Sequence, residues 1–414
     1  MNKLQNLVAD QWVDGDGDGK LLASAVSGEP IAAISSSGLD FEAILRHAKT
    51  VGGPELRKLT FHERGDMLKA LAIHLNEIKQ EFYELSTQTG ATRRDSWPDI
   101  DGGISTMFVF SSKGRREMPN DHVYLDGDVE QLSRNGTFVG QHICTPKLGA
   151  AIHINAFNFP CWGMLEKLAP TLLAGVPAII KPASSTAYLT ELMVRHIVES
   201  GILPPGSVQL ICGGVGDLFD YLDCQDTIAF TGSKNTAEML QAHPRVVSES
   251  VAFTAETDSL NMSILAPDSV PGTPEFDLYI QEVTREMTAK AGQKCTAIRR
   301  IIAPSAIAGE VVKALSTALS EIRIGNPALK EVQMGALASQ GQRDEIRDRI
   351  KDLSAEADVV FGGSDDFDVV DADSKKGAFF MPTLLYCEKP LGASAVHSVE
   401  AFGPVSTVLP YDSM

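Results

Sequence analysis

Ala150-Ala151-Ile152-His153-Ile154 is an apolar run of the kind that forms a buried strand. Pro160 follows it and favours the start of a helix, and Gly175 is placed to end that helix. The next apolar run is Ala178-Ile179-Ile180. A strand, a helix and a second strand joined by short links predict a parallel βαβ unit. His153, inside an apolar strand, is expected to be a core histidine whose polar atoms are hydrogen-bonded.

The same alternation continues toward the C-terminus. Further strands are expected at 208–212 and 227–231, with helices at about 186–200 and 217–222. This pattern is typical of a doubly wound parallel sheet, in which ligands bind at the loops that follow the carboxyl ends of the strands. The candidate loops are Asn158-Phe159-Pro160, Lys181-Pro182-Ala183-Ser184, Gly213-Gly214-Val215-Gly216 and Thr231-Gly232-Ser233.

The remaining segments have simpler patterns. Residues 8–35 are expected to form short strands and turns, and the Asp-Gly run at 14–19 is expected to be a turn. A calcium loop there would need Glu at its twelfth position, where the chain has Ala25. The segment 275–325 is expected to be helical around the loop that contains Cys295, and 341–361 to be a helix followed by a strand.

Size and composition exclude several classes of protein. The 414 residues are too many for one ordinary core and predict two or more domains. The net charge of −18 argues against a nucleic-acid partner. The longest apolar run, 168–180, contains Pro170 and Pro177, so no membrane span is expected. The 6 cysteines lack CxxC spacing and the 9 histidines are isolated, which predicts a cytoplasmic protein with no metal site.

Three residues are candidates for a catalytic role. Cys295 has Gly, Gln, Lys and Thr as neighbours, which favours a reactive thiol over a buried structural one. Glu256 is a candidate base, with a solvated loop carboxylate as the alternative. Asn158 is a candidate amide donor, with a turn residue or helix cap before Pro160 as the alternative. A nucleophile, a base and an amide donor are what oxidation of an aldehyde through a thioester requires.

These residues lie in motifs that resemble the aldehyde dehydrogenase family over nearly the whole chain. In the family's order the motifs are Phe157-Asn158-Phe159-Pro160, Ile180-Lys181-Pro182-Ala183, Phe230-Thr231-Gly232-Ser233, Glu256, Gly292-Gln293-Lys294-Cys295 and Glu400-Ala401-Phe402-Gly403-Pro404-Val405. The phrases Asn155-Ala156-Phe157-Asn158 and Glu256-Thr257-Asp258-Ser259-Leu260-Asn261 are similar to a subgroup, the ring-cleavage semialdehyde dehydrogenases of aerobic aromatic degradation, as in the benzoyl-CoA route. Members of that subgroup act on coenzyme A (CoA) thioesters.

The resemblance implies an aldehyde dehydrogenase-like α/β fold. Its nucleotide-binding domain, a doubly wound parallel sheet, would comprise 1–128 and 148–255. A small β element for oligomerisation would lie at 129–147, and an α/β catalytic domain at 256–414. Family members continue beyond the equivalent of Met414, so the C-terminal part of the catalytic domain is expected to be missing. A homodimer or higher homo-oligomer is also implied.

For catalysis, the resemblance implies that Cys295 attacks the aldehyde. The Asn158 side chain and the Cys295 backbone N–H would stabilise the oxyanion, and Lys294 is placed in sequence to favour the thiolate. Glu256 would activate water to hydrolyse the thioester. Family members that transfer the acyl group to CoA lack this Glu, so its presence implies a free acid as product.

The resemblance also implies a nicotinamide nucleotide site. Lys181 would hold the adenosine ribose, Ser233 at a helix start would meet the pyrophosphate, and Glu400 would hold the nicotinamide ribose. The other residues expected at this site are Phe157, Ser184, Gly232 and Phe402.

Ser184 bears on which nucleotide is used. NAD-preferring members often have Glu at this position, three residues after the lysine, where it would repel a 2′-phosphate. A serine would not, so NADP is predicted, with Lys181 and Ser184 contacting the phosphate, while NAD stays possible. The alternative is that Ser184 or Ser185 caps the next helix.

Two other functions remain open at this point. One is an NAD-dependent dehydrogenase of a free aliphatic or aromatic aldehyde, and the sequence shows no basic cluster for the phosphates of CoA. The other is an inactive relative with a binding or structural role.

Overall fold

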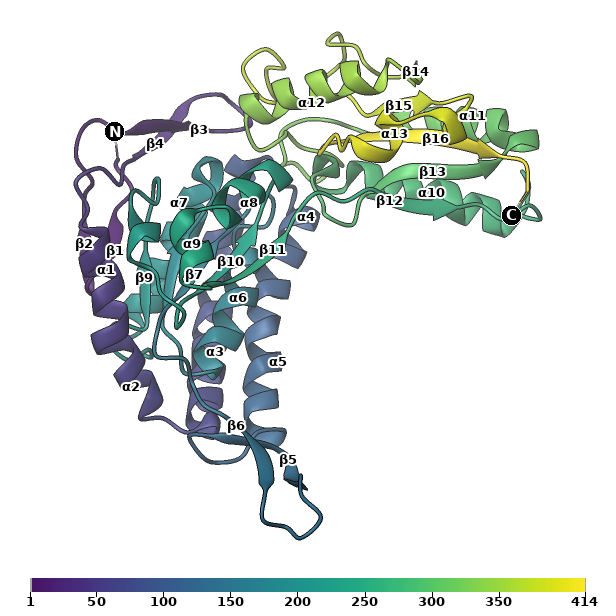
Figure 1. Ribbon diagram of the computed structural model, residues 1–414. Helices are drawn as coiled ribbons and strands as arrows, with labels where there is room; N and C mark the ends of the chain where they lie inside the picture. Colours follow the sequence, from purple (N-terminus) through teal and green to yellow (C-terminus); the bar gives the residue numbers. More distant parts are fainter. Residues whose placement is uncertain (1, 414) are drawn as a thin grey trace. The chain divides into compact units, whose positions relative to one another are not determined.

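The computed structural model describes residues 2–413. The chain divides into two compact units, each described here by itself (Figure 1). Unit 1 comprises the chain up to Leu22, Ala32–Phe82 and Trp97–Thr257. Unit 2 comprises Ala23–Ile31, Tyr83–Ser96 and the chain from Asp258 onward.

Unit 2 thus contains two N-terminal segments that the sequence-based division placed with the nucleotide-binding domain. Backbone hydrogen bonds account for this, because the Ala25 N–H donates to the Gln88 carbonyl at 2.9 Å. The Ala378 N–H in turn donates to the Ala25 carbonyl at 2.7 Å. The functional role of each unit stays a prediction.

Unit 1 contains a seven-stranded sheet with the order β11-β10-β7-β8-β9-β1-β2. The run from β11 to β9 is parallel, and β1 and β2 add antiparallel strands at one edge. The expected doubly wound parallel sheet is therefore confirmed. The strands are β1 (Asn6–Val8), β2 (Gln11–Val13), β7 (Ala151–Ile154), β8 (Ala178–Lys181), β9 (Val208–Leu210), β10 (Thr227–Thr231) and β11 (Ala252–Glu256).

Strand β7 is buried because helices cover both faces of the sheet. Ile152 and Ile154 belong to one apolar cluster with Phe41 of helix α1 (Phe41–His47). His153 points to the opposite face, where its Nε2 lies 3.0 Å from Thr171 Oγ1 of α6 (Trp162–Leu173). Burial lowers the pKa of His153 to about 3, so it is neutral and lies in the core as predicted. The prediction that its polar atoms are all hydrogen-bonded is wrong, because its buried Nδ1 has no partner among residues 2–413.

The other helices of unit 1 run along the sheet and its edges (Figure 1). They are α2 (Gly53–Arg57), α3 (Phe61–Ser86, which begins in this unit), α5 (Gly103–Arg116), α7 (Ala187–Glu199), α8 (Lys234–Gln241) and α9 (Pro244–Ser248). The expected helix at 217–222 is a single 3₁₀ turn, Leu218–Tyr221. The Asp-Gly run at 14–19 connects β2 to β3 (Lys20–Ala23), which pairs with β4 (Pro30–Ile34).

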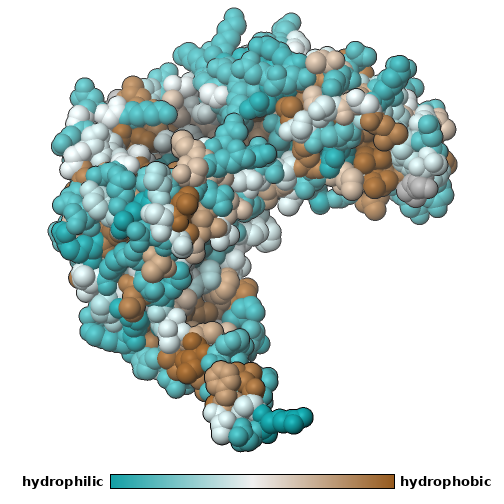
Figure 2. Space-filling view, viewed as in Figure 1, coloured by the Kyte–Doolittle hydropathy of each residue, from teal (hydrophilic) through white to brown (hydrophobic). Residues whose placement is uncertain are grey.

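A hairpin of β5 (Tyr124–Gln131) and β6 (Val139–Cys144) extends from unit 1 as a separate two-stranded sheet. Its side chains are mostly exposed, including large apolar ones, and Figure 2 shows apolar colour over this region. Exposed apolar residues of the hairpin are Leu125, Val129, Leu132, Phe138, Val139 and Ile143.

Unit 2 contains a five-stranded sheet with the order β12-β13-β16-β15-β14. Only β14 runs antiparallel to its neighbour. The strands are β12 (Asn261–Ile264), β13 (Ile298–Pro304), β14 (Asp358–Phe361), β15 (Thr383–Tyr386) and β16 (Val405–Tyr411). The helices are α4 (Arg93–Trp97, which ends in unit 1), α10 (Pro274–Thr288), α11 (Ala308–Ser320), α12 (Gln340–Leu353) and α13 (Ala395–Ser398).

The expectation of a helical 275–325 is wrong at β13. Burial alternates along this strand, with Ile301 and Ala303 inside, which is the period of a strand rather than a helix. Within residues 2–413, no helix has the length and apolarity needed to cross a bilayer. The same residues hold no group of three or more His, Cys, Asp or Glu side chains arranged for a metal ion.

Candidate active site

Asn158 lies in unit 1, in the loop between β7 and α6, and is buried. Asp99 holds the backbone that follows this loop. Its Oδ1 accepts hydrogen bonds from the Cys161 N–H at 3.0 Å and from the Trp162 N–H at 2.8 Å. Asp99 thus satisfies backbone donors at the start of α6. The helix cap is Cys161, not Asn158, so the alternative that Asn158 caps the helix is not seen.

Glu256 is the last residue of β11, where its side chain is exposed. Its carbonyl accepts from the Gly232 N–H at 3.1 Å, which sets the loop after β10 beside it. Ser233 is the N-cap of helix α8, and its Oγ accepts from the Thr236 N–H at 3.4 Å. Gly232 is required here because a Cβ would lie 2.7 Å from the Phe230 ring. Glu256, Gly232 and Ser233 therefore share one edge of the sheet.

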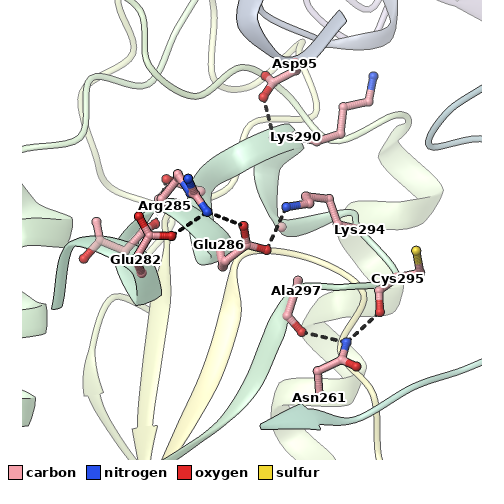
Figure 3. Close-up of polar contacts among 12 residues, drawn as sticks. Asp95, Asn261, Glu282, Arg285, Glu286, Lys290, Lys294, Cys295 and Ala297 are labelled. Carbon is pink, nitrogen blue, oxygen red and sulfur yellow. Dashed lines mark hydrogen bonds and ion pairs between the residues drawn. The ribbon is translucent and has the colours of Figure 1, made fainter. Parts of the chain in front are cut away.

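Cys295 lies in unit 2, in the loop before β13, and is exposed. That exposure contradicts the alternative of a buried structural thiol. The Cys295 carbonyl accepts from Ser259 Oγ at 2.7 Å and from Asn261 Nδ2 at 2.6 Å. In Figure 3 the thiol points away from Asn261. The backbone of Cys295 is therefore held while its thiol stays accessible.

Lys294 does not face the thiol. Its Nζ lies 2.7 Å from Glu286 Oε2, and Figure 3 shows the side chain directed toward that carboxylate. An ammonium already paired with a carboxylate has less effect on a neighbouring thiolate, because the two charges oppose each other. The structure thus gives no support to Lys294 as the group that favours the Cys295 anion.

The chain before Cys295 takes an unusual path. Lys290, Ala291 and Gly292 have φ values of 55°, 50° and 68°, which is left-handed backbone. For a residue with a Cβ this costs roughly 1–2 kcal/mol. Gly292 is needed for a second reason, since a Cβ there would lie 2.2 Å from the Gly403 carbonyl oxygen. Such a path persists only where surrounding groups hold it.

Arg299 holds several parts of the loop together from inside unit 2. Its guanidinium donates to the Gly403 carbonyl at 2.6 Å and the Gly292 carbonyl at 2.8 Å. Its Nε lies 3.5 Å from Glu400 Oε1, and its Cζ lies 5.4 Å from the centre of the Phe402 ring. Burial raises the pKa of Glu400 above its ordinary value, against the opposing effect of Arg299.

Comparison with known proteins decides the family. The profile of the aldehyde dehydrogenase family matches residues 12–414. The chain belongs to the aldehyde dehydrogenase family.

Individual relatives agree with this assignment. The chain is 46% identical, over 99% of its length and 79% of the relative's, to 3,4-dehydroadipyl-CoA semialdehyde dehydrogenase of Aromatoleum evansii. It is 24% identical, over 97% of its length and 79% of the relative's, to an NADP(+) succinate-semialdehyde dehydrogenase of Escherichia coli. The expected resemblance to the CoA-linked semialdehyde dehydrogenases is confirmed.

Solved structures support the fold. A betaine aldehyde dehydrogenase of Staphylococcus aureus in complex with NAD⁺ superposes with a TM-score of 0.86. The match covers 100% of this chain and 79% of that chain at 22% identity.

The nucleotide that aldehyde dehydrogenases use fits the sheet edge of unit 1. Asn155 follows β7, and both polar atoms of its buried amide lack a hydrogen-bond partner among residues 2–413. Its N–H donates to the Lys181 carbonyl at 3.0 Å, which places it at the expected ribose-binding lysine. Burial lowers the pKa of Lys181, and no carboxylate is ion-paired with it within the described residues. Buried polar groups without partners fit a site for a polar ligand.

Ser184 begins a 3₁₀ turn, Ser184–Thr186, directly after the loop that follows β8. The cap of helix α7 is Thr186, so neither Ser184 nor Ser185 caps it. The side chain of Ser184 is partly exposed.

The predicted residues of this aldehyde dehydrogenase divide between the two units. Unit 1 carries Phe157, Asn158, Lys181, Ser184, Gly232, Ser233 and Glu256, and unit 2 carries Cys295, Glu400 and Phe402. Sequence reasoning missed the residues that hold the loops, because their partners are distant in sequence. Those residues are Asp95, Asp99, Ser259, Asn261 and Arg299.

Proposed function

We propose that this aldehyde dehydrogenase oxidises a CoA-linked semialdehyde to the free acid, with NADP as the preferred nucleotide. The observation that carries the chemistry is the exposed Cys295 on a backbone held by Ser259 and Asn261. The substrate class is supported by the relative from Aromatoleum evansii, 46% identical, which is named for a CoA semialdehyde.

The proposed reaction uses three side chains. The Cys295 thiolate attacks the aldehyde carbon, and the resulting oxyanion receives hydrogen bonds from the Asn158 amide and the Cys295 N–H; one such donor is worth roughly 3–4 kcal/mol. The bound nucleotide supplies the hydride acceptor. Glu256 then takes a proton from the water that attacks the thioester, and the C–S bond breaks to release the acid and the Cys295 thiolate.

The nucleotide would occupy the sheet edge of unit 1. Lys181 and Ser184 would contact the adenosine ribose and its 2′-phosphate, and Gly232 and Ser233 the pyrophosphate. In unit 2, Glu400 and Phe402 would contact the nicotinamide end. Glu400 already accepts from the Ser259 N–H at 3.2 Å, so it would have to bind the ribose alongside that contact.

The assembly and location belong to the same proposal. Exposed apolar side chains on the β5–β6 hairpin fit a homodimer or higher homo-oligomer. All 6 cysteines are free, which fits a reducing cytoplasm.

Kinetics of Cys295→Ala and Glu256→Gln test the proposal. The first variant is expected to lose turnover and keep nucleotide binding. The second is expected to give one burst of reduced nucleotide and an acyl adduct on the Cys295 peptide, because hydrolysis is blocked. Turnover by Cys295→Ala, or the absence of that adduct, contradicts the assigned roles.

A substrate panel tests the specificity. Semialdehydes with and without CoA are assayed with NAD and NADP, and the highest kcat/KM is expected for a CoA-linked substrate with NADP. Higher efficiency with free aldehydes and NAD would favour the ordinary aldehyde dehydrogenase instead.

A further inference from the structure

Asp95 is a buried carboxylate whose two oxygens serve different partners. Oδ2 accepts from the Thr92 N–H at 3.1 Å and from Thr92 Oγ1 at 2.7 Å, at the start of helix α4. Oδ1 accepts from the backbone N–H of Lys290 at 2.7 Å (Figure 3). Asp95 and Lys290 are far apart in sequence and lie in the same unit. Capping of α4 needs only the first set of contacts.

The contact of Asp95 Oδ1 is with Lys290, the first residue of the left-handed run Lys290-Ala291-Gly292. The rest of the run is held by other groups: Gln293 Nε2 donates to the Lys290 carbonyl at 3.0 Å, and Arg299 Nη2 to the Gly292 carbonyl at 2.8 Å. The hydrogen bond from the Lys290 N–H to Asp95 holds the start of the left-handed run. This bond is strong because its acceptor is a charged carboxylate.

The direction of the backbone at Lys290 sets the path of the short loop that ends at Cys295. Two residues in this run carry a Cβ and are unfavourable in left-handed backbone, so they relax to ordinary backbone when released. Such a change rotates the peptides that follow and moves the thiol. A displacement of about 1 Å at a reacting group is enough to reduce a rate by roughly a hundredfold.

We propose that Asp95 is a positioning residue for the nucleophile: its carboxylate fixes the left-handed run and thereby the direction of the Cys295 thiol. The inference rests on the proposed function, in which Cys295 attacks the substrate. Asp95 is buried, and it acts on Cys295 through the Lys290 N–H.

The test compares four variants by kcat and by the rate of Cys295 carbamidomethylation, followed on its peptide by mass spectrometry. Asp95→Ala removes both sets of contacts. Asp95→Asn keeps an Oδ1 acceptor for Lys290. Thr92→Ala removes the Oγ1 that donates to Oδ2 and accepts from the Asp95 N–H, and it leaves the contact of Oδ1 with Lys290 in place. Asp95→Glu keeps the charge but displaces the carboxylate. Cys144 and Cys224, which are exposed, serve as internal references for alkylation in every variant.

Asp95→Ala and Asp95→Glu are expected to reduce kcat and the Cys295 alkylation rate by about tenfold or more, with the KM for nucleotide little changed. Asp95→Asn should stay within about threefold of the wild type, because the neutral hydrogen bond remains. Thr92→Ala should lower the melting temperature and leave both rates unchanged. If Asp95→Ala does not fold, Asp95→Glu against Asp95→Asn gives the same comparison.

Wild-type rates in Asp95→Glu or Asp95→Ala overturn the inference, as does an equal loss of both rates in Thr92→Ala. Failure of the proposed function looks different. In that case Cys295→Ala retains turnover, while Cys295 alkylation still reports whether Asp95 controls the loop.

Discussion

Asn261 Nδ2 lies 2.6 Å from the Cys295 carbonyl oxygen and 3.1 Å from the Ala297 carbonyl oxygen. One side-chain amide therefore holds the backbone on both sides of Thr296. Asn261 is also the first residue of β12, which pairs with β13. The edge of the unit 2 sheet thus fixes the chain where the proposed nucleophile lies.

Replacing Asn261 with Ala is expected to reduce kcat by roughly ten- to a hundredfold. Two hydrogen bonds are lost, each contributing about 0.5–1.5 kcal/mol, and the Cys295 loop gains freedom. Steady-state kinetics should show the loss in kcat rather than in the KM for nucleotide.

Asn326→Ala is a matched control, because Asn326 Nδ2 donates to Asp371 Oδ2 at 3.0 Å in an exposed part of the same unit. It should keep wild-type kcat. An Asn261→Ala enzyme as active as this control would show that the carbonyl contacts are unimportant for turnover.

The sequence predicted what depends on local pattern. The parallel sheet followed from apolar runs such as 150–154. The polar neighbours of Cys295 argued against a buried thiol, and the thiol is exposed, while its role as the nucleophile stays a prediction. The strand at 298–304 was missed, because its apolar residues lie next to Arg299 and Arg300 and a helical pattern surrounds them. Long-range contacts could not be predicted at all, since nothing in the sequence near Asp95 indicates that it binds the Lys290 N–H.

Ser184→Glu is expected to raise the dissociation constant for NADP by about tenfold or more and to leave that for NAD within about threefold. A carboxylate near a 2′-phosphate adds like-charge repulsion of at least about 1 kcal/mol. Fluorescence titration with each nucleotide measures this without turnover. Ser185→Glu, which adds the same charge one residue later, should change both constants much less. Equal weakening by the two variants would place the phosphate elsewhere.

Lys49 gives a prediction about pH. Its Nζ lies 2.8 Å from Asp223 and 2.7 Å from the buried Asp226. Burial lowers the pKa of Lys49, but its hydrogen bonds to the two carboxylates raise it above the ordinary value of 10.5. Burial raises the pKa of Asp223, yet the bonds from Lys49 and Gln225 bring it below 3.8. We expect Lys49→Met to reduce the free energy of unfolding by about 2 kcal/mol at neutral pH, mainly through Asp226.

The sign of the pH dependence follows from these shifts. Below the unfolded pKa of 10.5, Lys49 makes its full contribution to the free energy of unfolding. That contribution is lost as pH rises through the raised pKa of Lys49 in the folded protein. The contribution of Asp223 to the free energy of unfolding is present above pH 3.8. It is lost as pH falls through the lowered pKa of Asp223 in the folded protein. Urea unfolding should therefore give a difference in the free energy of unfolding between Lys49→Met and the wild type that is constant from about pH 5 to about pH 9. This difference should shrink below pH 3.8. A difference that grows on acidification would contradict this account.

The exposed apolar side chains of the β5–β6 hairpin lead to a prediction about how the proposed oligomer dissociates on dilution. Leu132 and Phe138 are 57% and 63% exposed, and the Leu132 N–H donates to the Phe138 carbonyl at 2.9 Å, so both lie at the tip. Burying each in an interface would contribute about 1.5–3 kcal/mol. If the hairpin forms the proposed oligomer interface, the double variant Leu132→Lys, Phe138→Lys is expected to raise the dissociation constant of that oligomer by roughly a hundredfold or more. Leu391→Lys, at an isolated exposed leucine, should not change it. Sedimentation velocity over a dilution series measures the effect, and a double variant with the mass of the wild type at every concentration would show that the hairpin does not hold the subunits together.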